Sequence, residues 1–193
     1  MVCLNFFDYC CDEIRPRIFE DNQVTEVAYA GDLSKGKSDF IYQCPQLKST
    51  IVNLYGSQVD GELQPCFKYQ GSVNPNKLVN AIEGHYGLVW NGVSADTCSG
   101  NFGEYLKYNS PHKLSLYLAS GMPVVVWKES AMAKLVSEKG IGIAISSLDE
   151  LDDLPGADSP EYKNMVQNLA PIRTDICSGN MLKKAITNIV SEV

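Results

Sequence analysis

Apolar and polar residues follow one another along the chain in short blocks that predict alternating strands and helices. Runs of apolar or β-branched residues bounded by Gly, Pro, Asn or Asp favour strands. Six such runs occur, at residues 24–29, 49–55, 66–70, 86–90, 123–127 and 141–145. The fifth, PVVVW, is apolar throughout, which is typical of a strand buried on both faces of a sheet.

Helical spacing of apolar residues appears between and after these runs. It predicts helices at residues 38–43, from 75, at 111–120, at 131–139, from 147, at 160–169 and at 180–193. The last helix carries its apolar residues on one face: Leu182, Ala185, Ile186, Ile189 and Val190. Strands that alternate with helices predict the α/β class, here a doubly wound, mostly parallel, six-stranded Rossmann-like sheet.

Two turns of the predicted sheet are expected to lie next to each other. In the usual strand order, 3-2-1-4-5-6, strands 1 and 4 are neighbours, and ligands bind beside their carboxyl ends. The turns that leave these ends are residues 31–37, with Lys35 and Lys37, and residues 91–110, which form a long loop. Long loops inside compact domains are usually functional or disordered, and the aromatic residues of this one argue against disorder. The sequence therefore predicts a phosphate site in this crevice.

The end of the long loop predicts an anion site. Ser110 is a favourable N-cap and Pro111 suits the first helical position. The free amides of His112, Lys113 and Leu114 would then face the loop. Lys113 opposes the helix dipole there, which is easier to explain if an anion binds. The alternative is a solvated lysine at a helix end.

Composition and charge narrow the possible functions. A net charge of −7 on 193 residues argues against nonspecific binding to nucleic acid or to an anionic membrane. No apolar run approaches the roughly 20 residues that span a bilayer, and the first residues lack the basic region of a signal peptide. Seven cysteines without zinc-type spacing indicate reduced thiols, so we expect a cytoplasmic protein.

Residues 1–22 fit the alternation poorly. A dense apolar cluster at residues 4–9 precedes a charged, Pro-containing stretch. We interpret residues 1–22 as an interdomain segment or a remnant of a preceding domain, whose apolar surface packed against another part of the protein. Residues 23–193 would then form the folded domain. The alternative is an N-terminal helix that packs on the core.

No familiar catalytic motif accompanies the crevice. The turn AGDLSKGKS lacks the G-x-G-x-x-G spacing of dinucleotide-binding domains, and no Walker A motif occurs in the sequence. His85 and His112 stand alone in the sequence, so neither a metal cluster nor a Ser-His-Asp set is predicted.

Four stretches resemble a known group of enzymes: YAGDLSKGKS, FKYQGSVNPNKL, residues 87–127, and AMAKLVSEKGIGIAISSLDEL. They are similar to the C-terminal half of bacterial GT-B glycosyltransferases, in particular β-1,6-galactofuranosyltransferases and the glucosyltransferases that extend sugars on serine-rich adhesins. The resemblance covers about residues 24–191. It implies a domain that binds a UDP-sugar, UDP-galactofuranose or UDP-glucose, for transfer to a glycan or glycoprotein acceptor held largely by an N-terminal domain. It also implies metal-independent chemistry; we further expect a homo-oligomer and at most peripheral membrane contact.

The resemblance also suggests donor contacts, without assigning a catalytic residue. Lys35 or Lys37 would contact the diphosphate, although related enzymes often have an Arg where Asp32 stands. The uracil ring would lie against Gly71, Ser72 and Val73. The remaining contacts would come from the long loop and helix start: Asp96, Thr97 and Gly100 at the sugar, Tyr105 and Lys107 at the sugar or β-phosphate, and Asn109, Ser110, His112 and Lys113 at the diphosphate.

Two other functions stay open at this point. A nucleotide-sugar-binding module without activity would use the same crevice. A nucleotide-sugar epimerase or dehydrogenase is disfavoured, because the sequence lacks both the glycine fingerprint and a Tyr-x-x-x-Lys pair.

Overall fold

The computed structural model describes residues 4–11 and 24–191. Its strands are β1 (Thr25–Asp32), β2 (Thr50–Ser57), β3 (Phe67–Gly71), β4 (Tyr86–Val89), β5 (Val124–Trp127) and β6 (Gly142–Ile145). Its helices are α1 (Phe40–Gln43), α2 (Pro75–Ala81), α3 (Gly100–Glu104), α4 (His112–Ala119), α5 (Ala133–Glu138), α6 (Pro160–Cys177) and α7 (Asn180–Ser191), with short 3₁₀ helices η1 (Tyr105–Lys107) and η2 (Leu148–Asp153).

The six strands form one parallel sheet in the order β3-β2-β1-β4-β5-β6. The predicted doubly wound fold and strand order are therefore confirmed. β1 and β4 are neighbours, and the chain leaves them toward opposite edges of the sheet. Every residue of β4 and β5 is buried, because helices or connections cover both faces of these central strands.

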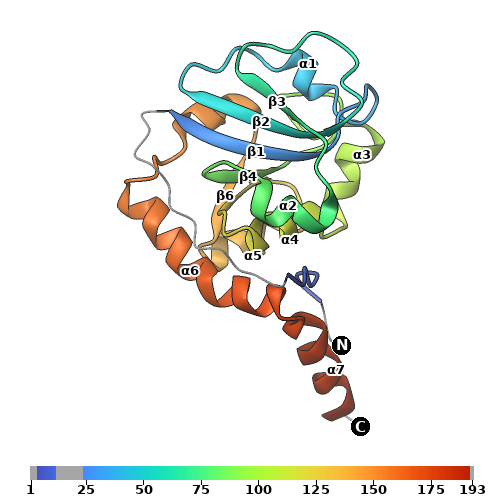
Figure 1. Cartoon of the computed structure of the whole chain (residues 1–193), viewed down its shortest axis with the longest axis vertical. Helices are drawn as coiled ribbons and strands as arrows, with labels where there is room; N and C mark the ends of the chain where they lie inside the picture. Colours follow the sequence, from blue (N-terminus) through green and yellow to red (C-terminus); the bar gives the residue numbers. More distant parts are fainter. Residues whose placement is uncertain (1–3, 12–23, 192–193) are drawn as a thin grey trace.

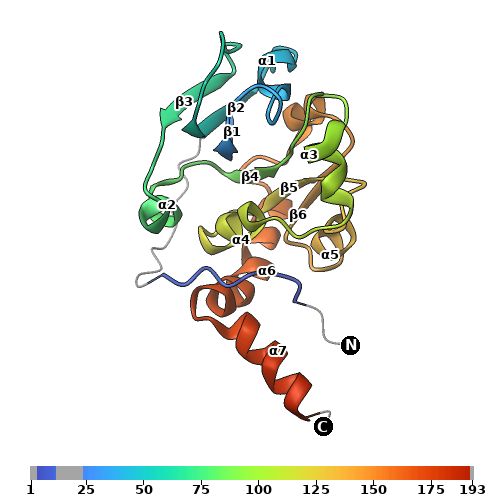
Figure 2. The same cartoon turned by 90° about the vertical axis from the view of Figure 1, so that its right-hand side faces the viewer.

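Helices lie on both sides of the sheet (Figure 1). α1 covers one face, and α2, α4 and α5 cover the other. α6 packs against α4, and α7 continues from it away from the sheet. Figure 2 views the sheet nearly end-on, from the side where α3 lies.

The long loop and the helices α4 and α6 differ from the predicted elements, and several other elements are shifted at their ends. The long loop at residues 91–110 contains α3 and η1, so it is partly helical. α4 begins at His112 with Pro111 as its N-cap, so Ser110 does not cap it. α6 continues through Pro171 to Cys177, well beyond the predicted end at residue 169. A proline removes one helical hydrogen bond, and the contacts of α6 with α4 outweigh that loss.

The C-terminal helix has the predicted apolar face. Leu182, Ile186, Ile189 and Val190 lie on it, and each side chain is more than half exposed. The described part of the chain therefore leaves this face uncovered. None of its helices is long and apolar enough to cross a bilayer.

The described N-terminal segment, residues 4–11, is extended and lies against α4, α6 and α7 (Figure 2). Phe6 is 2% exposed and belongs to the hydrophobic core. The amide of Tyr9 donates to the carbonyl of Ile176, 3.0 Å away. The apolar cluster is therefore not the free surface that the sequence suggested, and it is not helical. Residues 12–22 lie outside the described residues, so the predicted domain boundary stays a prediction.

A missing side chain in β4 lets α4 approach the sheet closely. A Cβ atom at Gly87 would lie 2.1 Å from Cγ of Tyr117, so the Tyr117 ring rests directly on the strand backbone. The Tyr117 hydroxyl then reaches across to accept a hydrogen bond from the amide of Ala30 in β1, 2.8 Å away. This contact fixes α4 relative to β1 and β4 together.

Replacement of Gly87 by alanine should destabilise the domain by about 3 kcal/mol, the upper part of the range for overpacked cores, because the methyl group overlaps the Tyr117 ring. Urea unfolding followed by circular dichroism measures this change. Gly156→Ala is the matched control, since a Cβ there meets no atom within 4 Å. Equal unfolding midpoints for the two variants would contradict the packing role of Gly87.

Candidate functional site

A pocket of about 350 Å³, here called the β1–β3 pocket, lies where β1, β2 and β3 end. It is lined by Ala30, Gly31, Asp32, Tyr55, Gly56, Ser57, Gln58, Ser72, Val73 and Leu78. The structure thus brings the predicted uracil contacts Ser72 and Val73 to the turn after β1. Gly71 ends β3 and is not among the lining residues.

The wall between β1 and β2 is backbone. A Cβ at Gly56 would lie 1.8 Å from the carbonyl oxygen of Gly31, and the φ of Gly56 is 156°. Gln58, two residues later, has a φ of 66°, which is uncommon for a residue other than glycine. Such conformations are held in place by their surroundings and cluster at binding sites. No sequence pattern around Gln58 predicted its place in the pocket.

The two lysines of the β1 turn point to different partners. Lys37 Nζ lies 2.6 Å from Asp32 Oδ2 and 5.7 Å from the centre of the Phe102 ring in α3. This hydrogen bond, with those from Ser34, lowers the pKa of Asp32 to about 2. Lys35 instead lies over the Tyr42 ring of α1, 5.7 Å from its centre. Asp32 therefore already neutralises the lysine that lies nearer the long loop.

Lys113 lies beneath the β1 turn, on the first turn of α4. Its Nζ donates to the carbonyl oxygen of Trp90 at 3.3 Å and to Oδ1 of Asn91 at 2.8 Å. The same nitrogen is 4.2 Å from the centre of the Tyr29 ring, within the range of a cation–π contact. A Cβ at Gly31 would be only 3.6 Å from it, so the absence of a side chain there leaves the ammonium close to the crevice.

Burial changes the acidity of this lysine. Desolvation lowers the pKa of Lys113 to about 7, because its partners are a carbonyl, an amide and an aromatic ring and not a carboxylate. Lys113 is therefore not the solvated lysine of the alternative interpretation. An anion that entered the crevice would favour the charged form of this lysine and be bound more tightly by it.

The start of α4 is open. Its first turn has no side-chain cap, and the amide of Leu114 donates to the carbonyl oxygen of Pro111 at 2.9 Å, so within the described residues the amides of His112 and Lys113 are the ones that can face an anion. Ser110 Oγ donates to the carbonyl oxygen of Asn5, 3.0 Å away, and the exposed His112 stacks on Phe7 with ring centres 4.3 Å apart. Oδ1 of Asn109 is buried without a hydrogen-bond partner. That atom is an acceptor, so it suits a hydroxyl donor and not a phosphate oxygen.

Two other predicted residues of the long loop, Lys107 and Tyr105, have different surroundings. Lys107 Nζ is paired with Glu104 at 2.8 Å and with Glu129 at 3.5 Å, and the hydrogen bond to Glu104 raises its pKa. Its charge is thus balanced by carboxylates before any ligand binds. Tyr105 is 59% exposed, so it does not serve to pack the loop.

Asp96 and Thr97 lie beside η2. The carbonyl oxygen of Ala95 accepts a hydrogen bond from the amide of Leu148 at 2.8 Å, which ties this segment to the end of the sheet near β6. Asp96 is exposed and Thr97 half-buried. Neither residue lines the β1–β3 pocket, so a role at the sugar stays a prediction.

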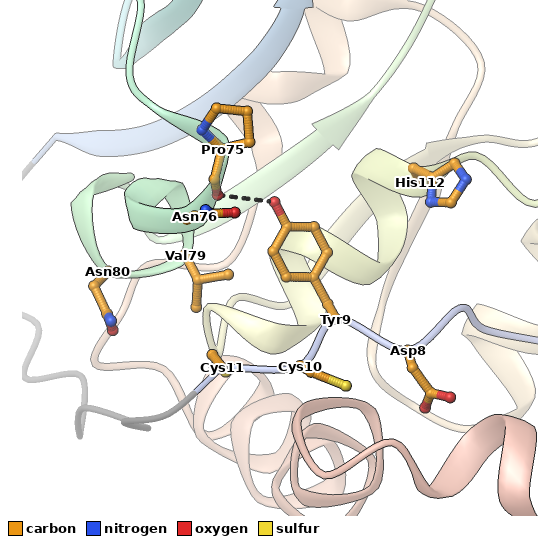
Figure 3. A pocket seen from close by; sticks show the side chains of 9 residues that line it. All are labelled: Asp8, Tyr9, Cys10, Cys11, Pro75, Asn76, Val79, Asn80 and His112. Carbon is orange, nitrogen blue, oxygen red and sulfur yellow. Dashed lines mark hydrogen bonds between the residues drawn. The ribbon is translucent and has the colours of Figure 1, made fainter.

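A larger hollow of about 700 Å³ lies between the N-terminal segment and α2 (Figure 3). Its lining residues are Asp8, Tyr9, Cys10, Cys11, Pro75, Asn76, Val79, Asn80 and His112. The Tyr9 hydroxyl spans it and donates to the carbonyl oxygen of Pro75, 3.3 Å away. Of the predicted site residues, only His112 lines this hollow. We therefore place the candidate site at the β1–β3 pocket and the start of α4.

Sequence reasoning missed the residues that hold Lys113. Tyr29, Trp90 and Asn91 gave no functional signal in the sequence. Tyr29 and Trp90 each stand at the end of an apolar run, and Asn91 opens a turn. Within residues 4–11 and 24–191, no group of three or more His, Cys, Asp or Glu side chains is placed to hold a metal ion.

Comparisons with known proteins show the family of this fold. The family model of the glucosyltransferase 3-like C-terminal domain matches residues 27–189. The β-1,6-galactofuranosyltransferase WbbI of Escherichia coli (strain K12) is 33% identical over 195 residues, which cover 98% of this chain and 57% of that protein. Glucosyltransferase 3 of Streptococcus gordonii is 29% identical over 147 residues, covering 75% of this chain and 43% of that protein. The chain thus spans about half the length of these curated relatives.

The fold has a counterpart among solved structures. The crystal structure of Anabaena HepE in complex with UDP matches with a TM-score of 0.51 and 18% identity, over 89% of this chain and 50% of that one. At this identity the match concerns the fold alone. Together with the matched family model, the parallel sheet and its strand order show that the chain belongs to the glucosyltransferase 3-like C-terminal domain family, a family of GT-B glycosyltransferases.

Proposed function

We propose that this chain is the donor-binding domain of a glycosyltransferase that uses a UDP-sugar, UDP-galactofuranose or UDP-glucose. The uracil ring would lie in the β1–β3 pocket beside Ser72 and Val73, and the diphosphate would lie between Gly31 and the first turn of α4. The observation that carries this proposal is the Lys113 ammonium, held 3.3 Å from Trp90 O and 2.8 Å from Asn91 Oδ1 at the carboxyl ends of β1 and β4. The UDP in the HepE structure supports the choice of nucleotide.

The proposed chemistry is stabilisation of a leaving group. When the bond from the sugar to the diphosphate breaks, negative charge grows on the β-phosphate. The amides of the uncapped α4 start and the Lys113 ammonium are positioned for that charge, with the positive end of the helix dipole behind them. Neither group requires a metal ion, so we propose metal-independent binding. The acceptor, a glycan or glycoprotein, would be held largely by residues outside this chain.

The cellular setting is also part of the proposal. The family and the net charge of −7 suit an enzyme that acts in the cytoplasm on a nucleotide-sugar pool, with at most peripheral membrane contact. We also propose that it is a homo-oligomer. The second candidate is a nucleotide-sugar-binding module without activity. Release of UDP from the UDP-sugar by the full-length protein, measured with and without glycan acceptors, separates the two candidate functions. A binding module would bind the UDP-sugar but release no UDP.

Isothermal titration calorimetry of the chain with UDP, in EDTA and then in magnesium, tests the nucleotide and the metal together. We expect binding of similar affinity in both buffers, because backbone amides and Lys113 supply the positive charge. Binding that appears only with magnesium would rule out the metal-independent site. The absence of binding in both buffers would contradict the proposed function.

Lys113→Met should weaken UDP-glucose binding by about 1.5–3 kcal/mol, the range for a hydrogen bond to a charged group, and leave uridine binding nearly unchanged. Methionine keeps the apolar stem of the side chain. Lys134→Met on α5 is the matched control, since Lys134 is an exposed lysine that pairs only with Glu138 among the described residues. Equal losses for UDP-glucose and uridine would mean that Lys113 serves the fold.

The affinity for UDP-glucose should also fall as the pH rises. In the free protein the pKa of Lys113 is lowered to about 7, so the charged form that binds the diphosphate is lost as the pH rises through 7. Linkage predicts a roughly tenfold weaker affinity at pH 8 than at pH 6. UDP-glucose suits this test because its diphosphate stays fully ionised over that range. A flat profile for the wild type, or the same slope in Lys113→Met, would contradict the assignment.

A further inference from the structure

Residues 5–11 form a strap that joins the start of α4 to the junction of α6 and α7 (Figure 2). At one end, Asn5 accepts the hydrogen bond from Ser110, and the amide of Phe7 donates to Ser115 Oγ at 2.9 Å. At the other end, the Asp8 carboxylate accepts the amides of Met181 and Leu182, both at 2.9 Å, and so caps α7. The strap therefore holds two regions of the fold together.

Cys11 of the strap lies beside Cys177, the last residue of α6. The amide of Cys11 donates to the carbonyl oxygen of Cys177 at 3.4 Å, and the Cys177 thiol donates to the carbonyl oxygen of Ala119 at 3.8 Å. This backbone hydrogen bond holds the two residues next to each other, as a disulfide requires, since disulfide-linked Cα atoms lie about 4.4–6.8 Å apart. Cys10 is exposed, and its Sγ would be 3.6 Å from a Cβ at Gly179.

We propose that Cys11 and Cys177 are a redox modification site, which forms a disulfide when it meets a small-molecule disulfide such as oxidised glutathione. The Cys11 thiolate attacks one sulfur of the oxidant, which releases one reduced thiol and leaves a mixed disulfide on Cys11. The Cys177 sulfur then attacks Sγ of Cys11, loses its proton to solvent and releases the second thiol. The protein gives up two protons and two electrons, and the oxidant is reduced to two thiols.

Exposure fixes the order of these steps. Cys11 is half-buried beside the large hollow that Figure 3 shows, so it can meet the oxidant first. Cys177 is 5% exposed, and burial raises its pKa to about 12, so it is the slower, resolving thiol. Its adjacency to Cys11 compensates, because an intramolecular attack has a high effective concentration. A disulfide at this point would clamp the strap that stacks Phe7 on His112 at the start of α4.

Thiol mapping tests the proposal on the full chain. The reduced protein is incubated with oxidised glutathione at pH 8, alkylated, digested and examined by mass spectrometry without reductant. We expect a peptide pair linked through Cys177, and two fewer of the seven thiols titrating in denaturant. Because the closed loop is long, the melting temperature should rise by roughly 10 °C and return to its original value in dithiothreitol.

Variants identify the pair. Cys11→Ser should abolish the cross-link, Cys10→Ser should retain it, and Cys44→Ala, at a buried cysteine outside the strap, should leave it unchanged. Cys11→Ser is preferred to a change at Cys177, because Cys11 is less buried. A Cys10–Cys11 disulfide, glutathione that stays on the strap while Cys177 remains reduced, or seven unreacted thiols would each overturn the proposal.

Discussion

The close approach of α4 to the sheet is the constraint on which the candidate site depends. Gly87 leaves room for the Tyr117 ring, and the Tyr117 hydroxyl accepts a hydrogen bond from β1. With α4 fixed against two neighbouring strands, its first turn lies under the β1 turn. A larger residue at Gly87 would move the helix start, the Lys113 ammonium and the crevice together. Packing in the core thus sets the geometry of a site at the edge of the sheet.

The electrostatics of the site follow from that packing. Lys113 is desolvated by its position, and its polar partners among the described residues are neutral, so its charged form is disfavoured in the free protein. Lys37 and Lys107, in contrast, are each paired with carboxylates. All three lysines were candidates in the sequence, and the folded protein leaves Lys113 as the one of these three whose charge a bound anion would restore.

Much of the fold could be predicted, because burial of β-branched runs and glycine- or proline-bounded turns are local properties of a sequence. PVVVW and STIVNLY predicted β5 and β2, and the alternation with helices predicted a parallel sheet, which has the usual strand order of its class. The helical content of the long loop and the continuation of α6 through Pro171 depend on tertiary contacts, so local patterns missed them. The contacts around Lys113 were missed for the same reason. Tyr29 and Trp90 are distant from Lys113 in the sequence, and they reach it only in the folded sheet.

The N-terminal segment shows the same limit. Its apolar cluster suggested a surface made for another domain, yet Phe6 is buried in this one, and Asp8 caps α7. Whether an apolar residue faces its own domain or a partner depends on shape, which a single sequence does not specify. The exposed face of α7 shows the opposite case, where the predicted apolar stripe is present and uncovered within the described residues.

A crystal structure of the chain with UDP tests the central claim most directly. The account predicts the uracil ring in the β1–β3 pocket beside Ser72 and Val73, and the β-phosphate within hydrogen-bond distance of Lys113 Nζ and the first amides of α4. Nucleotide bound in the hollow between the N-terminal segment and α2, or phosphates that contact Lys35 or Lys107 and leave Lys113 in its present contacts, would contradict it.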